Sequence, residues 1–201
     1  MTFLSERLGQ FSKLIGKTSF KIASFEKSFD DAQEELYKLF EETITNHKKI
    51  FVIGNGGSSG IASHHVVDLV NVLKVAAFTL SDNNLITCMG NDYGYESTFS
   101  RPLESLANLG DILIAISSSG QSKNILRACS VMKKKGGKVI TLSGFEENNP
   151  LRSLGDINIW TPEKDYGLVE SAHFFILHTL IDGWGKTKLN NKSEEIYLSE
   201  V

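Results

Sequence analysis

The stretch from Lys49 to Asp68 constrains the fold more than any other part of the chain. A short β-branched and aromatic run at 50–53 breaks into glycines and serines at 54–60, and an apolar-periodic segment follows. This order predicts a buried strand, a tight turn and the start of a helix. Glycines let a backbone approach a ligand, and the first amides of a helix are unpaired and carry its positive dipole end. The stretch therefore predicts an anion site suited to phosphate, with a turn that needs glycine only for its dihedral angles as the alternative.

The same pattern recurs further along the chain. The apolar run 111–116 is typical of a strand buried on both faces of a parallel sheet, and it leads directly into Ser117-Ser118-Ser119-Gly120-Gln121-Ser122. Four hydroxyls and several backbone amides at a helix N-terminus suit an ester phosphate when no arginine is supplied. An N-cap with solvated serines is the alternative. Four serines around one glycine after a buried strand favour the phosphate site.

Strands and helices alternate along the body of the chain. The predicted strands are 50–53, 75–80, 111–116, 138–142 and 156–160. This alternation predicts an α/β doubly wound fold with a five-stranded parallel sheet and right-handed crossovers. Ligands bind such sheets at the carboxyl ends of the strands, so both hydroxyl-and-glycine loops can face one ligand. The first turn lacks the G-x-G-x-x-G spacing, and a second, serine-rich loop has no role in a pyrophosphate fingerprint, which disfavours a dinucleotide site. The Walker lysine of a P-loop is absent as well.

Two amphipathic helices are predicted before the first strand, at 3–17 and 29–46. Half of the phenylalanines lie in the first fifth of the chain: Phe3, Phe11, Phe20, Phe25, Phe29 and Phe40. This enrichment suggests that residues 1–48 form an oligomer interface within the same domain as 49–185, and ordinary packing against the core is an equal alternative. Residues 186–201 are predicted to be a frayed tail or to dock on a neighbour.

Between the second and third strands, the sequence predicts a short helix at 84–89, a polar loop at 90–96 and a helix at 97–107.

Composition excludes several classes of protein. The 201 residues suit one domain, and a formal net charge of −3 with interspersed signs provides no basic stripe for nucleic acid or membranes. There is no apolar stretch of transmembrane length and no secretory signal, so a cytoplasmic protein is expected. Cys88 and Cys129 have no metal-type spacing and are predicted to be reduced core thiols.

Histidines near the first glycine loop are candidates for chemistry. His64 and Asp68 are four residues apart on a predicted helix and share one face. That spacing suits a metal pair or a base beside its partner, whereas an ordinary surface histidine is the alternative. His65 points elsewhere on the helix and is predicted to be structural.

The last predicted helix, 168–184, carries an acid and two histidines, Glu170, His173 and His178. Glu170 and His178 differ by eight positions, or roughly 12 Å of helix rise, so they reach one point only if their side chains lean together. Periodicity alone leaves open whether His173 or His178 is the active histidine.

Together these motifs resemble the SIS (sugar isomerase) domain family, and within it the bacterial phosphoheptose isomerases. The resemblance rests on 54–58, 90–94, 117–122 and the histidines at 64 and 178, and it spans about residues 30–185. It implies a cytoplasmic homotetramer with active sites between subunits and one Zn²⁺ per subunit. The implied reaction converts sedoheptulose 7-phosphate to D-glycero-D-manno-heptose 7-phosphate through an enediol, a step in ADP-heptose and lipopolysaccharide core biosynthesis.

The resemblance also implies a role for each site residue. Asp68 corresponds to the catalytic base and His178 to the acid, which decides between the two histidines of the last helix. The metal ligands would be His64, Asp68, Glu170 and His178. The substrate would be bound by Asn55, Gly56, Gly57, Ser58, Asp68, Asn91, Asp92 and Glu170, with its phosphate on Ser117, Ser118, Ser119 and Ser122.

The chain departs from the family pattern at four positions, with Asp68 for Glu, Glu170 for Gln, Val72 for Arg and Gly167 for Asp. The shorter base is displaced by about an ångström, which can cost about a hundredfold in rate. Glu170 adds negative charge, which strengthens metal binding or brings like-charge repulsion. The two retained histidines favour an enzyme. The altered positions 68, 72 and 167 favour a non-catalytic phosphosugar-binding protein of the replication-initiator-binding type, and an isomerase of a different sugar phosphate is a third hypothesis.

Overall fold

The computed structural model describes the backbone of residues 2–199 and the side chains of residues 2–187. Its centre is a seven-stranded sheet with the strand order β2-β1-β7-β6-β5-β3-β4. Five strands are parallel to one another: β3 (Lys49–Ile53), β4 (Ala76–Phe78), β5 (Ile112–Ser117), β6 (Lys138–Ser143) and β7 (Ile157–Trp160). The predicted doubly wound α/β fold and all five predicted parallel strands are confirmed, but the predicted count of five strands for the sheet is wrong.

The two additional strands form a hairpin at one edge of the sheet. β1 (Ser19–Ile22) pairs antiparallel with β7, and β2 (Phe25–Lys27) pairs antiparallel with β1. The two-residue connection, Ala23 and Ser24, has positive φ at both positions, 47° and 77°. Such turns usually carry glycine or asparagine, and because neither is present here, no turn signal marks the hairpin in the sequence.

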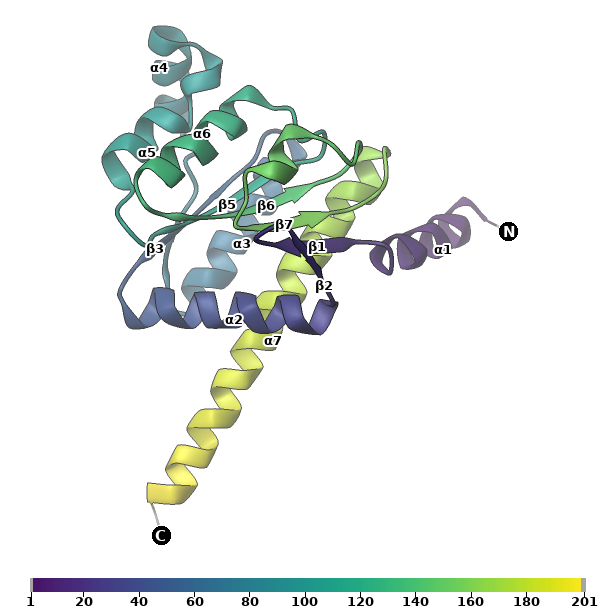
Figure 1. Ribbon diagram of the computed structural model, residues 1–201, viewed down its shortest axis with the longest axis vertical. Coiled ribbons are helices and arrows are strands. Elements are labelled where there is room, and N and C mark those ends of the chain that lie inside the picture. Colours follow the sequence, from purple (N-terminus) through teal and green to yellow (C-terminus); the bar gives the residue numbers. More distant parts are fainter. Residues whose placement is uncertain (1, 200–201) are drawn as a thin grey trace.

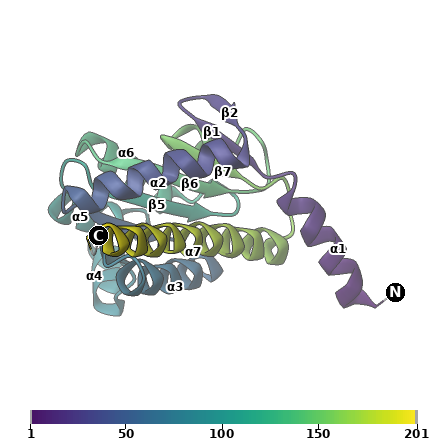
Figure 2. The same cartoon turned by 90° about the horizontal axis from the view of Figure 1, so that it is seen from below.

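Helices cover both faces of the sheet (Figures 1 and 2). One face packs against α2 (Phe29–Thr45), α3 (Gly57–Asn71) and α7 (Tyr166–Ser199), and the other against α5 (Ser100–Leu106) and α6 (Lys123–Lys134). Two apolar cores result, separated by the sheet, and strand residues such as Ile114 and Leu113 contribute to opposite cores because side chains alternate along a strand. Two 3₁₀ turns, η1 (Tyr95–Ser97) and η2 (Pro150–Ser153), complete the described elements.

The helix predicted at 84–89 is longer than its pattern indicated. α4 runs from Asn83 to Tyr93, with Asp82 as its N-cap accepting a hydrogen bond from the backbone N–H of Leu85 at 3.0 Å. It therefore includes most of the segment predicted as a polar loop. No residue of α4 is buried, and Cys88 is exposed, so the prediction that Cys88 is a core thiol is wrong. Cys129 is buried in α6, where burial raises the pKa of its thiol to about 12.

The two ends of the chain extend away from the body (Figure 1). α1 (Phe3–Ile15) contacts the rest of the molecule near its C-terminal end, where Leu14 is buried, and through Arg7, whose Nη2 lies 2.7 Å from Asp165 Oδ1. Residues 186–199 continue α7, and the side chains from residue 188 on lie outside the described residues, so the prediction that the tail is frayed or docks on a neighbour stays a prediction. Among the described residues, no helix is both long and apolar enough to cross a membrane.

Candidate active site

The two glycine- and serine-rich loops line one cavity. β3 and β5 are parallel neighbours with Ile53 opposite Ala115, so the loops that follow them leave the same edge of the sheet. The cavity has a volume of about 250 Å³. We call it the serine pocket, and its lining residues are Asn55, Gly56, Gly57, Ser58, Ile116, Ser117, Ser118, Ser119, Ser122, Tyr166 and Glu170.

Glycine is required at specific points of these loops. Gly120 has a φ of +65°, and a Cβ there would collide with the side chain of Asn149. A Cβ at Gly54 would collide with the backbone of Ser58 in the first turn of α3. The glycines therefore serve both the backbone conformation and the close approach of neighbouring protein groups, and the anion site stays a prediction.

The serine pocket is built from hydroxyls rather than cations. Ser58, Ser117 and Ser118 are buried, and the Ser117 hydroxyl donates to the Ser122 hydroxyl at 3.2 Å. The Ser118 hydroxyl is buried without a hydrogen-bond partner among the described residues. No lysine or arginine lines the cavity within the described part of the chain. A buried hydroxyl without a partner is costly in free energy, so this hydroxyl suits a ligand oxygen.

Glu170 is the charged residue of the serine pocket. It lies on α7, and its carboxylate is so close to Gly57 that a Cβ on that glycine would collide with it. Gly57 is the first residue of α3, where the unpaired amides and the positive dipole end favour a negative group. The carboxylate of Glu170 therefore lies where an anionic ligand would also be stabilised.

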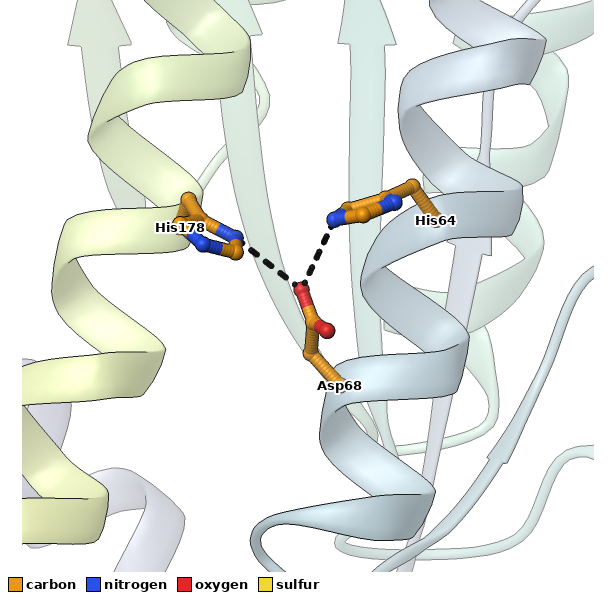
Figure 3. Close-up of side chains that lie close together, drawn as sticks. All are labelled: His64, Asp68 and His178. Carbon is orange, nitrogen blue, oxygen red and sulfur yellow. Dashed lines mark hydrogen bonds and ion pairs between the residues drawn. The ribbon is translucent and has the colours of Figure 1, made fainter.

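A second group of functional side chains lies further along the same two helices (Figure 3). His64 and Asp68 come from α3 and His178 from α7, and we call these residues the histidine cluster. Asp68 Oδ2 lies 3.3 Å from His64 Nε2 and 3.1 Å from His178 Nδ1. The shared face predicted for His64 and Asp68 is confirmed, and the fold brings His178 to it.

The donor set of the histidine cluster fits a metal ion such as zinc. Two imidazole nitrogens and one carboxylate oxygen lie within 4.8 Å of one another. The side chains of His64 and His178 are 44% and 41% exposed, against 16% for Asp68, which leaves room for further ligands. Three protein ligands with an open position are typical of catalytic zinc sites. Glu170, the fourth predicted ligand, is not part of this group, since eight residues of α7 separate it from His178.

The other histidine of α7 is a core residue. His173 is completely buried, its Nε2 lies 3.1 Å from the carbonyl oxygen of Ser143, and burial lowers its pKa to about 4. His65 on α3 is also buried, with Nδ1 2.7 Å from the carbonyl oxygen of Ile61, and burial lowers its pKa too. The structural role predicted for His65 agrees with this burial. Of the two histidines on α7, it is His178 that lies beside Asp68.

Two predicted substrate residues lie away from both groups. Asn91 and Asp92 are in the last turn of α4, where the Asn91 amide donates to the Asp92 carboxylate at 2.9 Å. Both are exposed and line none of the described cavities, so their role in substrate binding stays a prediction.

Sequence reasoning also missed residues around the site. Tyr166 lines the serine pocket, whereas Tyr95 and Asn124 contact the side chain of Asn55. Tyr95 follows the 90–94 motif and Asn124 follows the serine loop by two residues, which was the available signal for each.

Known proteins resemble this chain over most of its length. The family model described as SIS domain matches residues 18–144. This chain belongs to the SIS domain family. Its relatives include phosphoheptose isomerases of Helicobacter pylori, 36% identical over 168 residues, and of a Nitratiruptor species, 38% identical over 166 residues. The matches cover 79% and 78% of this chain and 87% and 88% of those relatives, which places the chain with the phosphoheptose isomerases within the SIS family.

Solved structures show the same fold. Phosphoheptose isomerase from Neisseria gonorrhoeae superposes with a TM-score of 0.78 at 24% identity, covering 91% of this chain and 99% of that one. The phosphoheptose isomerase from Francisella tularensis gives a TM-score of 0.77 at 28% identity, covering 92% and 100%. The predicted SIS fold is confirmed by both.

Proposed function

We propose that this SIS-domain chain is an aldose-ketose isomerase that converts sedoheptulose 7-phosphate to D-glycero-D-manno-heptose 7-phosphate through an enediol. The product would enter ADP-heptose and lipopolysaccharide core biosynthesis. The observation that carries the proposal is the position of Asp68 between two imidazoles, on the same helix whose first turn lines the serine pocket. The relatives named phosphoheptose isomerase support the choice of substrate.

The serine pocket would hold the phosphate. The hydroxyls of Ser117, Ser118, Ser119 and Ser122 and the first amides of α3 supply donors without a cation. The buried, unpartnered hydroxyl of Ser118 supports this role because a phosphate oxygen would satisfy it. In this arrangement Asn55 to Ser58 contribute chiefly through their backbone.

The distance between the two groups suits a sugar phosphate. Seven residues of α3, or about 10 Å of helix rise, separate Gly57 in the serine pocket from His64 in the histidine cluster. This length is comparable with that of an extended seven-carbon chain. A phosphate held in the serine pocket therefore allows the carbonyl end of the sugar to lie beside Asp68 and His178.

The histidine cluster would supply the proton transfers. Both imidazoles contact Oδ2 of Asp68, and among the described contacts none engages Oδ1 (Figure 3), so Oδ1 is available to accept a proton from C1 of the ketose. His178 turns Nδ1 toward Asp68, and its Nε2, which lies 3.6 Å from Asp182 Oδ2, would give a proton to the oxygen on C2. The resulting enediol receives the proton of Asp68 at C2 while the hydroxyl on C1 returns a proton to His178, which yields the aldose and restores both residues.

A zinc ion would be held by His64, Asp68 and His178, with Glu170 as the proposed fourth ligand after a shift of its side chain. Bound there, the ion would polarise the substrate oxygens and stabilise developing negative charge. Positioning, proton removal and proton return remain tasks of the protein's own side chains.

We further propose a cytoplasmic homotetramer with the active sites between subunits. The histidine cluster lies on an outer face of the α3–α7 pair, beside the exposed apolar side chains of Val67, Phe174 and Phe175. α1 presents exposed Phe3 and Leu4 as well. A second copy would cover these surfaces and enclose the site. Light scattering coupled to size-exclusion chromatography measures the assembly, and a monomer at micromolar concentration would contradict this part of the proposal.

The experiment that tests the function is an incubation of purified protein with sedoheptulose 7-phosphate, with and without added zinc, followed by detection of the aldose product. We expect turnover that depends on the metal. Tight binding of the sugar phosphate without turnover would instead identify a non-catalytic phosphosugar-binding protein. Turnover of another sugar phosphate, and not of this one, would identify an isomerase of different specificity.

A further inference from the structure

The side chain of Asn55 is already occupied by protein contacts. Its Nδ2 donates to Asn124 Oδ1 at 3.0 Å, and Asn124 Nδ2 donates back to Asn55 Oδ1 at 2.9 Å. The Tyr95 hydroxyl donates to the same Asn55 oxygen at 3.0 Å. We call this set of three residues the amide clasp. The Asn55 side chain is therefore held by the protein, although the loop that carries it faces the serine pocket.

Asn124 is the buried centre of the amide clasp. It is only 2% exposed and is the second residue of α6. Its Oδ1 also accepts from the backbone N–H of Ile125 at 3.0 Å, and its Nδ2 lies 3.4 Å from the hydroxyl of Thr98. Both ends of the amide are thus engaged, and any other orientation would leave buried polar atoms without partners.

The amide clasp joins the two loops that line the serine pocket. Asn55 belongs to the loop after β3, and Asn124 follows Ser122, the last serine of the loop after β5. Asn55 and Ser122 also line a neighbouring cavity of about 430 Å³, together with Gly94, Tyr95, Glu96, Lys123 and Asn124. The clasp therefore lies between the serine pocket and this second cavity, and it fixes the distance between the loops.

We infer that Asn124 and Tyr95 are positioning residues that hold the two loops in the arrangement in which their amides and hydroxyls converge on one phosphate. The inference rests on the proposed function, since it assigns residues to the binding step of that reaction. Loops of glycine and serine lose much conformational freedom when they are ordered. Contacts that order them before the ligand arrives raise affinity by lowering that cost.

Two substitutions and a matched control test the amide clasp. Tyr95→Phe removes one hydroxyl, and Asn124→Asp keeps the size of the side chain but places a carboxylate against Asn55 Oδ1. Thr141→Val is the control, because Thr141 is buried in β6 and its hydroxyl donates to Asn158 Oδ1 at 2.7 Å, outside both loops. Tyr95 is 59% exposed, so the control loses a more deeply buried hydrogen bond than Tyr95→Phe does, and it loses it elsewhere in the fold.

The first measurements are the dissociation constant of inorganic phosphate, by calorimetry, and KM and kcat for the sugar phosphate. For Tyr95→Phe we expect both the dissociation constant and KM to rise about fivefold, the loss of one net hydrogen bond, with kcat within about twofold of the wild type. Asn124→Asp should raise both by more than about tenfold. Thr141→Val should match the wild type in both. Unchanged values in the two clasp variants, or an equal change in the control, would overturn the inference.

Hydrogen exchange of the ligand-free protein gives a readout that needs no activity. Amides of residues 54–60 and 118–124 should exchange faster in both clasp variants than in the wild type or Thr141→Val. If the wild type fails to turn over the sugar phosphate but hydrogen exchange is faster in both clasp variants, the proposed function is refuted and the inference about the amide clasp is supported. If the wild type is active and neither exchange nor KM responds, the clasp is refuted while the function stands.

Discussion

The serine pocket and the histidine cluster share two helices and differ in almost every other property. The serine pocket is made of glycines and buried hydroxyls, and Glu170 is its only charged lining residue among those described. The histidine cluster is made of ionisable side chains that are partly exposed to solvent. Under the proposed function, this difference would separate binding of the substrate from the reaction, since neutral donors bind a phosphate without taking part in proton transfer.

The two groups also arise from different parts of the fold. The serine pocket depends on strand order, because β3 and β5 must be parallel neighbours for their loops to meet. The histidine cluster depends on helix periodicity and on the packing of α3 against α7. Substitutions in one group should therefore leave the other group's property intact, and this separation can be broken or sharpened by experiment.

The largest expected effect is on catalysis alone. Asp68→Asn removes the base while keeping the shape of the side chain, so we expect kcat to fall by about a thousandfold or more. The dissociation constant of phosphate should change by less than about twofold, because the serine pocket is untouched. Asp30→Asn is the matched control, since Asp30 is exposed in the first turn of α2 and belongs to neither the histidine cluster nor the serine pocket. Full activity of Asp68→Asn would refute the assignment of the base.

Removal of metal should also lower the rate of catalysis and leave phosphate binding unchanged. After dialysis against a chelator, we expect kcat to fall by about a hundredfold and to recover on addition of zinc. Phosphate binding, measured by calorimetry on the same samples, should be unaffected because no cluster residue lines the serine pocket. Undiminished turnover by protein shown to be free of metal would contradict this expectation.

A third prediction compares the buried and exposed histidines of α7. The folded pKa of His173 is about 4, below its unfolded value, so its neutral form contributes stability that is fully present above about pH 6.5 and is lost as the pH falls toward 4. At about pH 5 the loss from this residue is about 2 kcal/mol. Urea unfolding at about pH 7 and about pH 5 measures this loss. Between these two pH values, the free energy of unfolding of His173→Gln should decrease by correspondingly less than that of the wild type. An unchanged decrease would show that His173 does not titrate in this way.

The smallest predicted effect concerns the unpartnered hydroxyl of the serine pocket. Ser118→Ala should weaken phosphate binding by about tenfold, the value of one charge-assisted hydrogen bond. The free energy of unfolding should stay the same or rise by about 1 kcal/mol, because the hydroxyl has no partner to lose among the described residues. Ser130→Ala, an exposed helix position whose hydroxyl donates to Leu126 O, is the control for both measurements. A clear loss of stability in Ser118→Ala would show that the hydroxyl has a structural partner.

Much of this architecture could be predicted because it follows from short-range patterns. Continuous apolar runs indicated the parallel strands, and the loops after β3 and β5 were expected to meet because parallel strands end at one edge. The spacing of His64 and Asp68 placed them on one helix face. The hairpin of β1 and β2 was missed because Ala23 and Ser24 adopt positive φ without a glycine or asparagine to signal it.

The remaining features depend on long-range contacts that leave no local pattern. Periodicity placed Glu170 and His178 on one helix, but it did not indicate that the Glu170 carboxylate lies against Gly57 in the first turn of α3. The pairing of Asn55 with Asn124 joins residues 69 positions apart, and each amide alone is an ordinary polar residue. Such contacts are determined by the packed fold rather than by spacing along the chain.

The most direct test of the proposed chemistry follows the proton. Wild-type protein and Asp68→Asn are each incubated with sedoheptulose 7-phosphate in D₂O, at concentrations that fill the serine pocket to the same extent. NMR then measures deuterium at the carbon beside the carbonyl. We expect solvent deuterium to appear in substrate and product with the wild type, and none above background with Asp68→Asn. Bound sugar phosphate that takes up no deuterium and yields no aldose, or equal uptake with both proteins, would contradict the claim that Asp68 acts on a substrate held by the serine pocket.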